Sequence, residues 1–139
     1  MIKKLLALSV SAGLLAAALP AFAAAPTSAQ IACVGTAVNT RESAIDAAMS
    51  AYTAAANAAY SARASALQAA YSQPAGNGAI RTAVNAAWSA FRSAVSAARK
   101  AWQTGRNSAW TTFRTSVRAC KAPAVTTDSS NSAQEASGQ

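Results

Sequence analysis

The positions of the only two cysteines constrain the fold of this chain more than any other feature. Cys33 and Cys120 lie at nearly equal distances from the turn-forming run Pro-Ala-Gly-Asn-Gly at 74–78. Between the cysteines, Pro and Gly are almost confined to this run, and Ala, the strongest helix former, dominates the rest. The sequence therefore predicts an all-α fold. It is a long antiparallel helical hairpin, with helices over about 36–72 and 79–119, and a disulfide clasps its open end.

The N-terminal segment indicates export. Lys3-Lys4 precede an apolar stretch over 5–19, and Ala21-Phe22-Ala23 supplies the small residues of a cleavage site. This order is typical of a Sec signal peptide, predicted over 1–23. The apolar run before Pro20 is shorter than the roughly 20 residues of a membrane-spanning helix, so an uncleaved anchor is the less favoured alternative. We expect a secreted or periplasmic protein whose thiols meet in an oxidising compartment.

Residue types recur every eleven positions, most clearly in the second arm. The segments 88–95 and 110–117 share one pattern of aromatic, basic and β-branched residues. An eleven-residue repeat corresponds to about 3.67 residues per turn, which keeps a recurring residue class on one face of a nearly straight helix. We expect the two resulting stripes to form the hairpin core. They hold Ile45, Met49, Tyr52, Tyr60, Leu67 and Tyr71 in the first arm, and Ile80, Val84, Trp88, Phe91, Val95, Trp102, Trp110, Phe113 and Val117 in the second.

A disulfide between the cysteines would also fix the register of the arms. Facing residues would then have numbers that sum to about 153, which places Asp46 near Arg106. Arg106 interrupts an apolar series, and a buried charge is tolerated when an opposite charge pairs with it. The sequence therefore predicts a core salt bridge between Asp46 and Arg106. Gly105 marks the place where the second helix would break if the fold had three helices.

A hairpin of this composition is expected to be marginally stable, because Ala buries little apolar area. Closing the loop between the cysteines would stabilise it by roughly 4 kcal/mol in the chain-entropy model. Homo-oligomerisation, with two hairpins forming a four-helix bundle, is the other route to stability.

Positive charge is concentrated in the second arm. Residues 79–121 include eight basic and no acidic side chains, whereas in the first arm Arg41 and Arg63 are balanced by Glu42 and Asp46. The spacing predicts a basic ridge about 50 Å long that would attract an anionic polymer, such as extracellular nucleic acid or wall polymer, or an anionic membrane surface. Simple solubility is the alternative interpretation. The ridge residues are Arg81, Arg92, Lys100, Arg114 and Arg118.

Catalytic patterns are weak. The chain has no His, and the hairpin holds only two carboxylates, Glu42 and Asp46. Ser96 and Lys100 lie four apart, a spacing we attribute to coincidence in so Ser-rich a chain. Gly-rich phosphate loops and paired-cysteine zinc motifs are absent from the sequence. We therefore expect no enzymatic activity, metal, cofactor or small-molecule substrate, but a structural or interaction module of the cell envelope or extracellular space, or alternatively a binder of anionic polymers.

The last segment, 121–139, is rich in Ser, Thr, Ala and Gln and is predicted to be a disordered polar tail. It holds Asp128 and Glu135, half of the four acidic residues in the chain. We expect a flexible, mildly acidic end without a specific role.

Two resemblances follow from these patterns. Thr or Ser recurs every eleven residues in the Ala-rich second arm, which resembles the helical type I antifreeze proteins and would imply ice binding, although Arg81, Arg92 and Arg114 directly precede three of these residues. The hairpin as a whole is similar to uncharacterised secreted Ala-rich helical proteins of bacteria that carry a terminal cysteine pair. That resemblance implies no activity. The repeating residues are Thr82, Ser93, Thr104 and Thr115.

Overall fold

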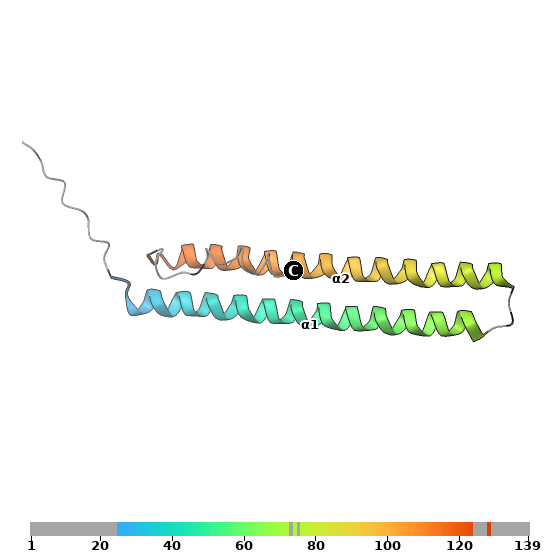
Figure 1. Ribbon diagram of the computed structural model, residues 1–139. Helices are drawn as coiled ribbons and strands as arrows, with labels where there is room; N and C mark the ends of the chain where they lie inside the picture. Colours follow the sequence, from blue (N-terminus) through green and yellow to red (C-terminus); the bar gives the residue numbers. More distant parts are fainter. Residues whose placement is uncertain (1–24, 73, 75, 124–127, 129–139) are drawn as a thin grey trace, which may run out of the picture.

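The computed structural model describes residues 25–72, 74, 76–123 and 128. Within these residues the fold consists of two long helices, α1 (Ser28–Ser72) and α2 (Asn77–Ala119). They lie side by side in opposite directions and form a hairpin (Figure 1), which confirms the predicted fold. The predicted signal peptide, 1–23, lies outside the described residues, as do 124–127 and 129–139 of the predicted tail.

Helix α1 begins eight residues earlier than the sequence analysis placed it, at Ser28 instead of about 36. A reciprocal capping arrangement explains the difference. The Thr27 hydroxyl accepts a hydrogen bond from the backbone N–H of Gln30 at 3.2 Å, and Oε1 of Gln30 accepts one from the N–H of Thr27 at 2.8 Å. This is the Thr-x-x-Gln capping box, a signal that the sequence contains and that our prediction overlooked.

The disulfide between Cys33 and Cys120 forms as predicted, with 5.7 Å between the two Cα atoms. A second contact reports the register independently, because a Cβ built on Gly105 would lie 2.9 Å from the Cβ of Ala48. The two pairs of residue numbers have the same sum, so the predicted register is confirmed. Helix α2 also runs unbroken through Gly105. The glycine therefore allows a close helix approach and does not interrupt the helix.

The core is built largely from alanines, which the sequence analysis did not include. Small side chains let the helices approach closely, whereas Met49, Tyr60, Tyr71 and Trp88 of the predicted stripes remain exposed. Trp102, Trp110 and Phe113 are buried as expected, with Phe113 at 1% exposure. The buried positions are Val34, Ala37, Arg41, Ala59 and Ala70 in α1 and Ala87, Ala98, Trp102, Ala109, Trp110 and Phe113 in α2.

A matched pair of glycine substitutions tests the close approach. Gly35→Ala should stabilise the protein by up to about 1 kcal/mol, because a Cβ there meets nothing within 4 Å and alanine favours the helix. Gly105→Ala should instead destabilise it by about 1–3 kcal/mol, because the new methyl group collides with Ala48. Urea denaturation measures both changes. Equal stabilisation by the two substitutions would contradict the close contact.

Candidate functional site

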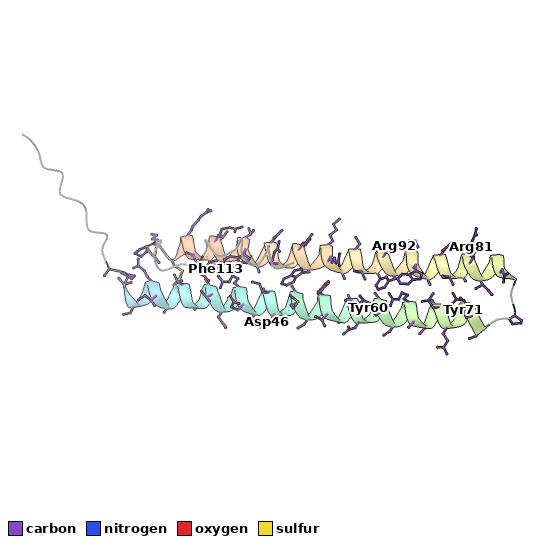
Figure 2. All side chains as sticks on the ribbon, viewed as in Figure 1. Asp46, Tyr60, Tyr71, Arg81, Arg92 and Phe113 are labelled. Carbon is purple, nitrogen blue, oxygen red and sulfur yellow. A yellow bond between two sulfur atoms is a disulfide. The ribbon has the colours of Figure 1, made fainter. Side chains whose placement is uncertain are left out.

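The basic ridge is one of three surfaces that the hairpin offers to a partner. All five predicted ridge residues are exposed (Arg81, Arg92, Lys100, Arg114 and Arg118). Figure 2 shows Arg81 and Arg92 on the side of α2 that faces away from α1. Within the described part of the chain, the salt bridges all involve Arg41, so no carboxylate there neutralises the ridge.

The predicted salt bridge between Asp46 and Arg106 does not form. Nε and Nη2 of Arg106 instead donate hydrogen bonds to Oδ1 of the adjacent Asn107, at 3.3 and 3.0 Å. Asp46 is exposed on the outer side of α1 (Figure 2). The reason is helical geometry, since one residue step rotates a side chain by about 100° and the preceding residue, Ile45, already occupies the interface.

The buried charge of the core is Arg41, which the sequence analysis treated as a surface charge balanced by nearby acids. Its side chain is 5% exposed. The guanidinium carbon lies 4.3 Å from the centre of the Trp110 ring and 4.5 Å from that of Phe113. These two rings are themselves edge to face, with centroids 5.6 Å apart. Such cation–π contacts are worth about 0.5–2 kcal/mol each, which helps to offset the desolvation of the charge.

Two carboxylates complete the Arg41 cluster, which we define as Arg41, Glu42, Trp110, Phe113 and Asp128. Nε and Nη2 of Arg41 donate to Oε1 of Glu42, and Nη1 donates to Oδ1 of Asp128 at 2.7 Å. The hydrogen bond between Arg41 and Asp128 raises the pKa of Arg41 and lowers the pKa of Asp128. Asp128 belongs to the predicted disordered tail, so the structure gives this residue a specific contact that the sequence analysis did not expect.

Low pH should break the contact between Asp128 and Arg41. The pKa of Asp128 in the folded protein lies below its ordinary value of 3.8, so the contact adds stability above that value and loses it as the pH falls through the folded pKa. NMR of the Arg41 Nη1–H signal, the group that donates to Asp128, follows this step between about pH 5 and pH 2, since carboxyl groups titrate in that range.

The matched control is Asp128→Asn, which keeps the side-chain shape but cannot titrate. In this variant the Arg41 signal should lose the component that follows the protonation of Asp128. Identical titration curves in both proteins would show that Asp128 does not bind Arg41.

The same arrangement recurs two eleven-residue repeats along the hairpin, around Arg63. The guanidinium carbon of Arg63 lies 4.5 Å from the centre of the Trp88 ring and 4.4 Å from that of Phe91. Trp88 and Phe91 are edge to face at 5.9 Å, as Trp110 and Phe113 are. Tyr60 adds a third ring, 5.0 Å from the guanidinium carbon. We call Tyr60, Arg63, Trp88 and Phe91 the Arg63 cluster.

The two clusters differ in their anionic partners and in their exposure. Ala64 stands where the first cluster has Glu42, and among the described residues no carboxylate lies within ion-pair distance of Arg63. Trp88 is 39% exposed, whereas the equivalent Trp110 is 4% exposed. The Arg63 cluster is therefore an open version of the Arg41 cluster. The eleven-residue spacing of Arg41, Tyr52 and Arg63 could have revealed this shared position in the sequence.

The third surface is a shallow groove between the helices, lined by small side chains. Near the turn it forms an open hollow of about 630 Å³ between Ala66 and Ala90. Arg63 and Phe91 line one of the smaller hollows towards the disulfide and Arg41 lines another, so of these only the hollow near the turn is lined by Ala and Ile side chains alone. We call this surface the alanine groove. Its lining near the turn is Ala66, Ala69, Ala70, Ala79, Ile80, Ala83, Ala86, Ala87 and Ala90.

Comparison with known protein families, curated proteins and solved structures found no match to this chain. In the part of the chain that the structure describes, neither helix has a stretch apolar enough to cross a membrane. The fold and its surfaces therefore carry the functional argument alone.

Proposed function

We propose that this protein is an exported, non-enzymatic interaction module that binds an anionic polymer along the basic ridge. The observation that carries the proposal is the uncompensated charge of α2, a helix of 43 residues that contains no acidic side chain. Its ridge residues are exposed, so their charges can reach a partner. The disulfide is compatible with an extracellular or periplasmic location, which the predicted signal peptide also favours.

A polymer fits the ridge better than a small anion does. Arg81 and Arg92 are eleven residues apart, which corresponds to about 16 Å along a helix, and Arg114 lies two repeats beyond Arg92. Charges so far apart do not converge on one phosphate or carboxylate group. They match a partner that carries many charges along its length. Binding to such a partner releases counterions, and its affinity falls steeply with added salt because that release then gains less entropy.

Charge reversal at Arg81, Arg92 and Arg114 tests this function. The triple Glu variant should bind single-stranded DNA, a polyanionic wall polymer or anionic vesicles at least about tenfold more weakly than the native protein at low salt. The triple Lys variant is the matched control, because it keeps the charge and should keep most of the affinity. Circular dichroism checks that each variant remains helical. Unchanged binding of the Glu variant to all three probes would refute the proposal.

A second candidate function is assembly through the alanine groove, with a second copy of the hairpin as its occupant. Small residues allow close helix packing, and none of the residues that line the groove near the turn is charged. Light scattering of the native protein should then give a dimer. Ala90→Arg, which places a charge in the groove, should give a monomer. A native protein that is monomeric at high concentration would exclude this assembly.

A further inference from the structure

The Arg41 cluster shows which ligand its aromatic and guanidinium groups accept. Trp110 and Phe113 hold the guanidinium, and its N–H groups donate to a carboxylate that arrives from 87 positions away in the sequence. Asp128 is thus a carboxylate presented by a distant segment, and not a neighbour on the same helix. The cluster acts as a receptor for an acidic side chain, built into the hairpin.

The Arg63 cluster repeats the guanidinium and the two aromatic rings of the Arg41 cluster, but among the described residues it binds no carboxylate. Arg63 contacts the Trp88 and Phe91 rings at almost the same distances as Arg41 contacts its own rings. Rings fix the plane of a guanidinium and leave its edges free, which suits the paired hydrogen bonds that arginine makes with carboxylates. The partly exposed Trp88 adds apolar surface for the residues around such a carboxylate.

The chain's own tail is a poor source of this ligand while Asp128 occupies Arg41. Arg63 lies about 33 Å further along α1 than Arg41, from the rise of about 1.5 Å per residue. Glu135 is the next acidic residue after Asp128, and the seven residue steps from Asp128 to Glu135 span at most about 25 Å of backbone, so Glu135 approaches Arg63 only when the backbone and both side chains are fully extended. An acidic segment of another molecule meets no such limit.

We propose that the Arg63 cluster is a binding site for a carboxylate on an extended acidic peptide segment of a partner protein. This site is separate from the basic ridge, and none of its residues belongs to the ridge. The partner segment would place an Asp or Glu side chain on the guanidinium of Arg63 and its neighbouring residues against Trp88.

The probe is a synthetic peptide with the sequence of residues 121–133, which contains Asp128 and which we add to the full-length protein. NMR follows the side-chain N–H signals of Arg63 and Trp88. Both signals should shift on addition of the peptide. The peptide with Asp128→Asn should need an at least about tenfold higher concentration to produce the same shifts. The protein variant Arg63→Lys should bind about tenfold more weakly, because lysine keeps the charge but loses the planar, paired donors.

Three results would overturn the proposal. The peptide could perturb only Arg41 and Trp110, which would mean that it merely displaces the native tail. It could shift Arg63 and Trp88 equally well with Asp or Asn, which would remove the role of the carboxylate. Acetate at the same carboxylate concentration could produce the same shifts, which would show that the peptide around the carboxylate contributes nothing.

Discussion

Reduction of the Cys33–Cys120 disulfide should lower the free energy of unfolding by about 4 kcal/mol, the largest effect that we expect from any single change. The bond closes a loop with a sequence separation of 87, so its loss greatly increases the entropy of the unfolded chain. The hairpin has little to compensate this loss, because its core is mostly alanine and each alanine buries a small area. For a domain of this size the melting temperature should fall by roughly 15–30 °C.

Thermal denaturation followed by circular dichroism measures this change with and without reductant. The double variant Cys33→Ser/Cys120→Ser should melt at the same temperature as the reduced native protein. Reductant should leave the melting temperature of that variant unchanged, which controls for other effects of the reagent. A native protein that melts at the same temperature in both redox states would show that helix packing alone holds the hairpin.

Arg41→Ala should have the second largest effect, a loss of about 2–3 kcal/mol. The substitution leaves unfilled the space over the Trp110 and Phe113 rings and removes the cation that binds Glu42 and Asp128. This loss of stability is smaller than the loss expected on breaking a fully buried ion pair. Both carboxylates are partly exposed, so water hydrates them when the arginine is gone. Urea denaturation at neutral pH measures the change.

Arg41→Met separates the effect of lost packing from the effect of the lost positive charge. Methionine fills a similar volume over the two rings without a charge, so it should restore most of the stability while the contact with Asp128 remains lost. Arg63→Ala is the matched control at the repeated position, where no carboxylate is bound among the described residues and the side chain is less buried. Arg63→Ala should lower the free energy of unfolding by less than Arg41→Ala does. Equal losses at both positions would mean that the carboxylates contribute nothing to stability.

The fold could be predicted because its main determinants are the positions and spacings of residues along the sequence. The cysteine positions, the central turn and the eleven-residue repeat together specify a clasped hairpin and its register, and the contact of Gly105 with Ala48 agrees with that register. The repeat also identified the faces that meet. It did so through large apolar residues, although many of the positions that are most buried hold alanine.

The contacts of the Arg41 cluster were missed for a physical reason, although the eleven-residue spacing of Arg41 from Tyr52 places Arg41 in the apolar stripe. Hydrophobic patterning assigns a charged residue to the surface, and only three-dimensional contact shows that rings from α2 and carboxylates on both sides accommodate this one. Asp128 reaches Arg41 from a segment whose composition carries no signal for such a contact. The partner predicted for Arg106 was wrong because it was chosen from the sum of residue numbers alone. The guanidinium of Arg106 instead donates hydrogen bonds to Asn107.

The most direct test of this account is a set of distances between spin labels that leaves the disulfide intact. One label is placed at Asn57 through an unnatural amino acid, and the second at Asn85, Ser96 or Asn107, which are all exposed and lie eleven residues apart on one face of α2. The predicted register makes the distance from Asn57 to Ser96 the shortest, since each repeat displaces the second label by about 16 Å. A minimum at Asn85 or Asn107, or no short distance at all, would contradict the clasped hairpin register.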